Sequence, residues 1–178
     1  MRTFLALPIP DTTIDALIRL QSTLPTGRSV PEDNLHLTLT YLGDTPEEVL
    51  ETLHDLLTAS RLPAAQITFG GLGTFAEMER GLTFAAVHPS DTLTALQAKV
   101  AQLARTAGAT LPRRRFRPHV TLTRANRQPK GPARDHLAAA MGAQPDIPGF
   151  TTHALCLYQS HLSPQGARHE VLATYPLG

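Results

Sequence analysis

The sequence contains a single cysteine, Cys156, and no long apolar run. One cysteine rules out an internal disulfide framework and any zinc site built from four cysteines. A membrane-spanning helix needs roughly 20 consecutive apolar residues, and no stretch of the chain approaches that length. The first residues, MRTFLALPIPD, are apolar over too short a distance for a signal peptide. We therefore expect a soluble, cytoplasmic protein without a membrane partner.

The composition also argues against a disordered chain. Hydrophobic residues make up 42% of the sequence and the formal net charge is only +1, whereas disordered chains combine few apolar residues with a high net charge. A length of 178 residues is sufficient to bury a hydrophobic core. No segment has the composition of a linker, so we expect one domain or two closely joined lobes. We also expect a monomer.

The near-neutral total conceals an uneven distribution of charge. Ten of the 16 lysine and arginine residues lie within residues 92–134, which contain no Asp or Glu. Four of them are Arg113, Arg114, Arg115 and Arg117. A concentrated basic segment suggests a phosphate-bearing ligand, but a solvated surface in a chain with 14 arginines and 2 lysines would give the same pattern.

Hydrophobic periodicity predicts a mixture of strands and helices. Strands are expected at 3–8, 35–42, 65–69, 82–87, 120–123, 152–159 and 170–174, and helices at 11–20, 46–57, 91–106 and 135–141. Asp11 and Asp91 are the expected N-caps of two of these helices, residues 25–31 are expected to be a loop, and residues 71–75 are expected to be a tight turn. Strand–helix units recur in both halves, which favours an α+β fold with largely antiparallel sheets.

One five-residue pattern occurs twice. The sequence HLTLT begins at His36, and HVTLT begins at His119. His-x-Thr alone is expected about once by chance in a chain of this composition, but His-x-Thr-Leu-Thr is expected only about 0.02 times. The two copies therefore indicate an internal repeat.

The spacing within the repeat suggests a shared site. Alternate residues of a strand lie on one face, so His36, Thr38 and Thr40 are expected to face away from a core that takes the intervening leucines. The same holds for the copy that begins at His119. If the two halves pack as pseudo-symmetric sheets, two imidazoles and two hydroxyls converge on one cleft. The alternative is two ordinary strands with exposed or hydrogen-bonded histidines.

Two histidines and two threonines are suited to chemistry at phosphorus. An imidazole titrates near pH ~6.5, so one ring can act as a base while the other, protonated, acts as an acid. Threonine hydroxyls can hold the non-bridging oxygens of a phosphoryl group during an in-line displacement. Arg124, near the end of the second strand, is placed to steady the phosphate, whereas the corresponding residue after His36 is Tyr41.

With these motifs the chain resembles the RNA 2′,3′-cyclic phosphodiesterases, or 2′-5′ RNA ligase-like family, of the 2H phosphoesterase superfamily. The resemblance covers nearly the whole chain and includes RTFLALPIP (2–10), VPEDNLHLTLTYLG (30–43), GGLGTF (70–75), FRPHVTLTR (116–124) and residues 157–176. The chain departs from the family at Ser29-Val30, where an aromatic residue is common, and at His169, where tyrosine is usual.

The resemblance implies an α+β, bilobal, pseudo-symmetric fold in which two antiparallel sheets face a central cleft and helices pack outside. It implies one domain over residues 1–178 whose two lobes are intertwined. The implied activity opens a terminal 2′,3′-cyclic phosphate on RNA to a 2′-phosphate, with no metal or other cofactor. The implied substrates are RNA ends, such as those of tRNA fragments, or small cyclic nucleotides. His36 would protonate the leaving 3′-oxygen and His119 would activate water. The expected substrate-binding residues are Thr38, Thr121, Arg124 and Arg117.

Other features of the sequence point less clearly to a function. GLGTFA, from Gly71, fits a dinucleotide-binding fingerprint, but a new strand follows too soon for the long helix that this fingerprint needs. The other histidines lack the i, i+4 pairing with a glutamate that marks a zinc hydrolase. Cys156 lies in an apolar strand and is expected to be buried and inert. Weak RNA ligation by the reverse reaction, and an RNA-binding module that keeps the motifs as scaffold, remain alternatives.

Overall fold

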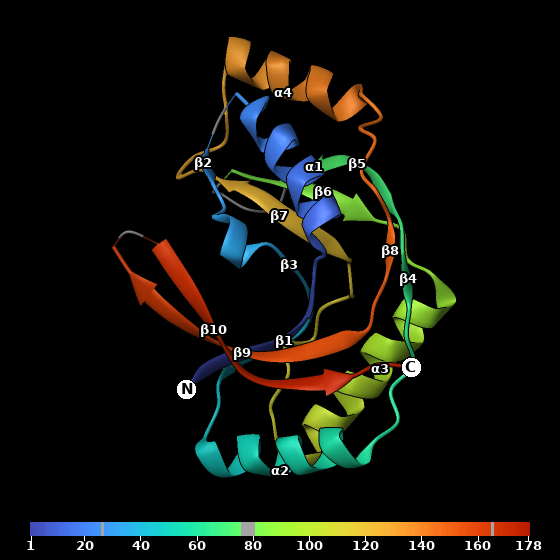
Figure 1. Ribbon diagram of the computed structural model, residues 1–178. Helices are drawn as coiled ribbons and strands as arrows, with labels where there is room; N and C mark the ends of the chain where they lie inside the picture. The colour runs from blue at the N-terminus through green and yellow to red at the C-terminus, as the bar shows by residue number, and fades with distance from the viewer. Residues whose placement is uncertain (26, 76–80, 165) are drawn as a thin grey trace.

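Two four-stranded antiparallel sheets form the framework of the chain in a computed structural model, which describes residues 1–25, 27–75, 81–164 and 166–178 (Figure 1). The first half contains β1 (Arg2–Pro8), α1 (Asp11–Ser22), β2 (Arg28–Ser29), the 3-10 helix η1 (Glu32–Asn34), β3 (His36–Asp44), α2 (Glu47–Ala59), β4 (Gln66–Ile67) and β5 (Phe69–Thr74). The second half contains β6 (Leu82–Val87), α3 (Asp91–Thr106), β7 (His119–Arg124), α4 (Pro132–Gly142), β8 (Phe150–Thr151), β9 (Ala154–Ser163) and β10 (Gly166–Pro176).

The two halves exchange strands. Sheet A has the order β10-β9-β1-β3, and sheet B has the order β2-β7-β6-β5. Strand β5 belongs to the first half of the chain but pairs with β6 of the second, and β9 belongs to the second half but pairs with β1 of the first. The short strands β4 and β8 pair with each other. Each sheet therefore needs both halves of the repeat to be complete.

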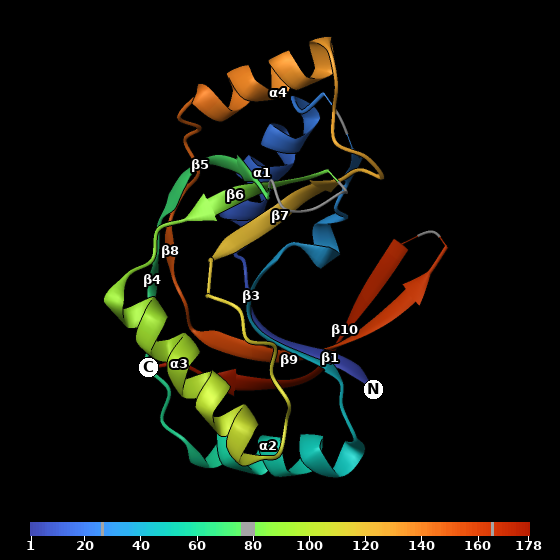
Figure 2. The ribbon, with the colours of Figure 1, turned by 180° about the vertical axis from the view of Figure 1, so that it is seen from behind.

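The helices cover the outer faces of the sheets, and two of them, α1 and α3, cross from one sheet to the other. Helices α2 and α3 lie against sheet A, and α1 and α4 lie against sheet B (Figures 1 and 2). Helix α1 follows β1 of sheet A but contacts β7 of sheet B, whereas α3 follows β6 of sheet B but contacts β3 of sheet A. In the motif strands, the buried residues that face these helices are Leu37, Leu39, Val120 and Leu122.

The expected α+β class with antiparallel sheets is confirmed, but most of β5 lies where a turn was expected, and the short strands β2 and β8 were not expected. Residues 71–75 were expected to form a turn, but most of them belong to β5, which pairs with β6. A Cβ atom added at Gly73 would lie 2.6 Å from the ring of Phe84. Glycine is therefore required in this strand because an aromatic ring lies directly on its backbone, not because the chain turns there.

Smaller differences concern element ends. The N-caps are Pro10 and Ser90, one residue before the expected Asp11 and Asp91, and the Ser90 Oγ accepts a hydrogen bond of 3.1 Å from the backbone of Leu93. The expected loop at 25–31 contains the short strand β2, which pairs with β7. Within the described part of the chain, no helix is long and apolar enough to cross a membrane.

Candidate active site

The two motif histidines begin equivalent strands, His36 in β3 and His119 in β7. These strands belong to different sheets but contact each other. A positive charge on His119 lowers the pKa of His36, which requires the two rings to lie within electrostatic reach. The structure thus brings the two imidazoles into one site between the sheets.

Each imidazole is oriented by the same hydrogen bond. The Nδ1 atom of His36 lies 2.8 Å from the carbonyl oxygen of Asn34, and that of His119 lies 2.6 Å from the carbonyl oxygen of Arg117. A carbonyl oxygen only accepts, so Nδ1 carries the hydrogen and the neutral ring keeps a lone pair on Nε2. Neither Nε2 has a hydrogen-bond partner among the described residues. Both rings therefore offer the same atom for proton transfer.

A β-bulge occurs at the same position of both motifs. The pairing register skips Leu39 in β3 and Leu122 in β7. A bulge bends the strand and changes the direction of the side chains around it. The first threonine of each motif, Thr38 or Thr121, is partly exposed, whereas the last threonine of each motif is buried. Only the first threonine of each motif is thus accessible to a ligand.

Two glutamines hold the bulged residues from the helices behind them. The Nε2 of Gln21 in α1 donates to the carbonyl oxygens of Val30 and Leu122, each at 2.9 Å. The Nε2 of Gln97 in α3 donates to the carbonyl oxygen of Leu39 at 3.3 Å. Because of the exchange of helices, each glutamine supports the motif strand of the sheet onto which its helix has crossed.

This pair gives a first prediction, for which one variant serves as the control of the other. We expect Gln21→Met to lower the free energy of unfolding by about 2 kcal/mol, because two short bonds are lost and the Val30 carbonyl is left without its donor. We expect Gln97→Met to cost less than about 1 kcal/mol, because its single bond is longer and partly exposed. Urea denaturation at neutral pH measures both, and equal losses would contradict this account.

Aromatic rings surround His36. Phe4 of β1 stacks on the His36 ring, with centroids 4.8 Å apart and an interplanar angle of 29°. His169 of β10 meets the same ring edge-on at 5.2 Å and 82°, and Tyr158 of β9 lies 6.0 Å away. This aromatic cage shields much of the His36 ring from water, although the residue stays partly exposed.

The cage determines the charge of His36. Burial lowers the pKa of His36 to about 4, and the positive charges of His169, Arg124 and His119 act in the same direction, while the bond to Asn34 opposes them. Desolvation disfavours the charged form of an imidazole. The lowered pKa therefore favours the uncharged form of His36 at neutral pH.

His119 has a similar but more open surrounding. The rings of Phe75 and Phe84 lie 5.0 and 5.1 Å from the His119 ring, and the guanidinium of Arg117 lies 4.7 Å from the centre of the Phe75 ring. Burial is the main cause that lowers the pKa of His119, followed by the charges of Arg124 and Arg117, and the bond to the Arg117 carbonyl opposes them.

Arg124 occupies the centre of this charge pattern. It is the last residue of β7 and is exposed. Its charge lowers the pKa of His36, His119 and His169 alike, which places its guanidinium near all three rings. The charge of Arg117 lowers the pKa of His119 but not that of His36, so Arg117 lies farther from the first motif.

Asn34 links the first motif to the β9–β10 hairpin, a contact that the sequence did not reveal. Its Nδ2 donates to the carbonyl oxygen of Ala167 at 2.6 Å, and its Oδ1 accepts from the backbone of His169 at 3.3 Å. Its own carbonyl oxygen accepts from His36. Asn34 therefore holds both the orientation of His36 and the position of His169 beside it.

A comparison with protein families identifies the superfamily of the chain. Residues 10–164 match the model of the 2′-5′ RNA ligase superfamily. The chain belongs to this superfamily. Members of the superfamily therefore provide the natural comparison for the fold and for the site between the sheets.

Similar proteins include two named RNA 2′,3′-cyclic phosphodiesterase. The one from Thermus thermophilus is 30% identical over 99% of this chain and 90% of its own length. The one from Geobacillus stearothermophilus is 28% identical over 98% of this chain, which spans only 56% of that longer relative. The crystal structure of Escherichia coli LigT complexed with 3′-AMP has a TM-score of 0.80 and 25% sequence identity, and the match covers 99% of this chain and 97% of that one.

The remaining motifs of the sequence lie outside the cleft between the two histidines or in part outside the described residues. The fingerprint that begins at Gly71 lies in β5, and its last residue, Ala76, is outside the described residues. Among the described residues, no group of three or more His, Cys, Asp or Glu side chains is placed to hold a metal ion. Cys156 is 5% exposed, as expected for a buried thiol.

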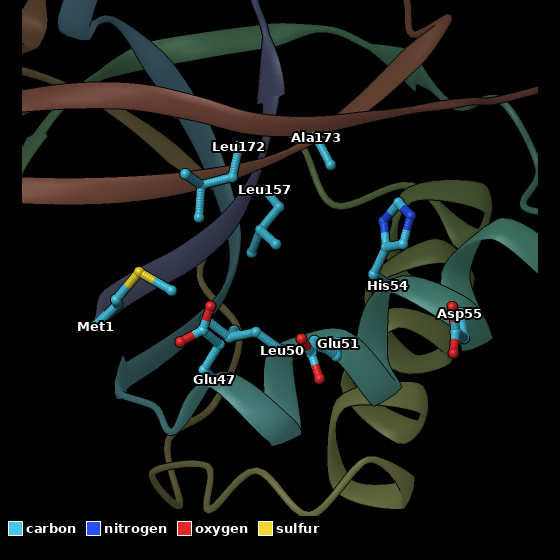
Figure 3. A pocket seen from close by; sticks show the side chains of 9 residues that line it. All are labelled: Met1, Glu47, Leu50, Glu51, His54, Asp55, Leu157, Leu172 and Ala173. Atoms are coloured by element: carbon cyan, nitrogen blue, oxygen red, sulfur yellow. The ribbon is translucent and has the colours of Figure 1, made fainter.

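A separate pocket of about 500 Å³ lies on the other face of sheet A (Figure 3). His54 and the acidic residues Glu47, Glu51 and Asp55 of α2 line it opposite Leu157 of β9. Leu157 points away from the His36 side of the sheet because it alternates with Tyr158 along β9. This pocket contains neither motif histidine and is not part of the candidate active site.

Proposed function

We propose that this protein hydrolyses the 2′,3′-cyclic phosphate at the end of an RNA to a 2′-phosphate. The observation that carries the proposal is the pair of imidazoles that are held by identical Nδ1 bonds, offer Nε2 and share the nearby charge of Arg124. The names of the curated relatives support the same reaction class. The substrate is thus an RNA end, and the reaction needs neither a metal nor another cofactor.

The reaction is an in-line displacement of the 3′-oxygen by water. His119 Nε2 accepts a proton from the water, whose oxygen forms a bond to phosphorus as the bond from phosphorus to the 3′-oxygen breaks. His36 Nε2 gives its proton to the departing 3′-oxygen. The hydroxyls of Thr38 and Thr121 donate to the non-bridging oxygens, and Arg124 balances the negative charge that develops on them. The two rings return to their starting states by proton exchange with solvent.

The charge of His36 is expected to change when the substrate binds. An acid must carry its proton before the bond breaks, yet burial lowers the pKa of His36 to about 4. A bound phosphate brings a negative charge next to the ring and partly cancels the charge of Arg124, and both effects raise the pKa of an imidazole. An imidazolium held in such a desolvated place is a strong acid and so suits a poor leaving group such as an alkoxide.

The decisive experiment uses an oligoribonucleotide that ends in a 2′,3′-cyclic phosphate, in excess EDTA. We expect turnover at the same rate with and without EDTA, and a product that carries a 2′-phosphate and a free 3′-hydroxyl. A 3′-phosphate product would contradict the assignment of the leaving oxygen. Binding of the RNA without turnover would show a binding module instead of an enzyme, and inhibition by EDTA would contradict the metal-free mechanism.

A further inference from the structure

A pocket of about 600 Å³ adjoins His119. Two of its walls are Phe75 and Phe84, the same rings that contact the His119 imidazole. Phe116 adds a third aromatic wall, and the side chains of Arg115 and Arg117 contribute the charged part of the lining. The pocket therefore combines flat apolar surfaces with two cations directly beside the reacting centre.

The cations of this pocket are distinct from the one at the reacting phosphate. The charge of Arg124 lowers the pKa of both motif histidines, whereas the charge of Arg117 lowers that of His119 alone. Within the described residues, neither Arg115 nor Arg117 forms an ion pair with a carboxylate. If the cyclic phosphate lies between the two imidazoles beside Arg124, the two pocket arginines remain for a second phosphate.

A nucleotide has the chemistry that matches this lining. Bases stack on aromatic side chains regardless of their sequence, and arginines contact the phosphates that connect them. The cation of Arg117 over the Phe75 ring keeps that ring and the guanidinium next to each other. A cyclic mononucleotide has one phosphate, which the reaction itself uses. The next phosphate along an RNA is the phosphodiester on the 5′ side of the terminal nucleotide.

We propose that the pocket formed by Phe75, Phe84, Phe116, Arg115 and Arg117, here called the upstream pocket, binds the nucleotide immediately 5′ of the reacting one. The protein then prefers an oligoribonucleotide to a cyclic mononucleotide as its substrate. This inference rests on the proposed function, because the upstream pocket is defined relative to a cyclic phosphate between the two histidines.

The first test compares three substrates of the wild-type protein. They are adenosine 2′,3′-cyclic phosphate, the dinucleotide of two adenosines ending in the same cyclic phosphate, and that dinucleotide without its upstream base. We expect kcat/KM for the dinucleotide to exceed that for the mononucleotide by at least about tenfold, with the abasic substrate between them, because stacking and phosphate contacts are both lost in the mononucleotide. The advantage of the dinucleotide should shrink as salt concentration rises.

The outcomes separate this inference from the proposed function. Equal kcat/KM values for mononucleotide and dinucleotide would overturn the upstream pocket while supporting the hydrolase. A failure to hydrolyse any of the three substrates would overturn the proposed function, and the upstream pocket with it. An abasic substrate as good as the intact dinucleotide would contradict stacking in the pocket.

Variants localise the effect, with the ratio of dinucleotide to mononucleotide kcat/KM as the readout. Arg115→Ala and Phe75→Leu should bring this ratio close to one. The ratio corrects for any general damage from Phe75→Leu, since Phe75 also touches His119. Arg114→Ala is the matched control, because Arg114 is exposed in the same basic segment but does not line the pocket, and it should leave the ratio at the wild-type value. An equal fall in Arg114→Ala and Arg115→Ala would show diffuse charge attraction instead of a pocket.

Discussion

Replacement of either motif histidine with alanine is expected to reduce kcat/KM for an RNA with a cyclic-phosphate end by about 10²–10⁴-fold. In the proposed mechanism, His36 and His119 carry out the two proton transfers of one displacement, so the loss of either histidine blocks the whole step. The variant that lacks both should therefore lose little more than each single variant, since residues that act as a unit are not additive. Single-turnover rates on the labelled oligonucleotide measure all three losses.

The asparagine variants give a control for folding. An asparagine at position 36 or 119 keeps an N–H near the place of Nδ1, and so retains a donor for the Asn34 or Arg117 carbonyl. It lacks any atom at the place of Nε2. If His36→Asn and His119→Asn are folded and inactive, the loss belongs to Nε2. Full activity in both would show that the reaction takes place elsewhere.

The direction of proton flow can be tested with a changed leaving group. A substrate in which sulfur replaces the 3′-oxygen departs as a thiolate and does not need a proton from the protein. We expect this substrate to restore most of the activity of His36→Asn and none of that of His119→Asn. The opposite pattern would exchange the two roles and make His36, whose pKa is lowered to about 4, the base.

The local pattern of the motifs was sufficient to predict the strands and their buried leucines, but it was wrong for Thr40 and Thr123, which were expected to face away from the core and are buried just after the bulges. Alternation of leucine with polar residues places Leu37 and Leu39 in the core, as it does Val120 and Leu122 of the second copy. The same rule does not place Phe4, because residues 4–7 of β1 are all apolar and all buried, so the sequence has no alternation there.

The remaining parts of the site depend on contacts that are distant in sequence. Asn34 bonds to Ala167, 133 residues away, and no local pattern indicates that a short 3-10 helix meets a hairpin from the other end of the chain. The bulges at Leu39 and Leu122 depend on pairing with neighbouring strands. A glycine such as Gly73 has the same signature in a turn as under an aromatic ring, so only tertiary packing distinguishes the two.

The second large effect concerns stability in acid. We expect the free energy of unfolding of the wild-type protein to fall between pH 6.5 and pH 4, with His36 contributing roughly 2 kcal/mol of that loss. The pKa of His36 is lowered from 6.5 to about 4 in the folded protein. Between these values the unfolded chain binds a proton that the folded ring does not, so stability falls as the pH falls. Above pH 6.5 neither the folded nor the unfolded chain holds this proton, so none of this stability is lost.

A phenylalanine at position 36 tests this account, because it removes the titration and keeps a ring to stack on Phe4. The difference in unfolding free energy between pH 7 and pH 4.5, from urea denaturation, should be smaller in His36→Phe than in the wild-type protein by about 2 kcal/mol. The control is His136→Phe, which changes an exposed histidine of α4 and should retain the wild-type difference. A wild-type difference in His36→Phe as well would show that burial does not lower the pKa of His36. In the proposed mechanism, the same desolvation that destabilises the fold in acid would make the His36 imidazolium a stronger acid toward the 3′-oxygen.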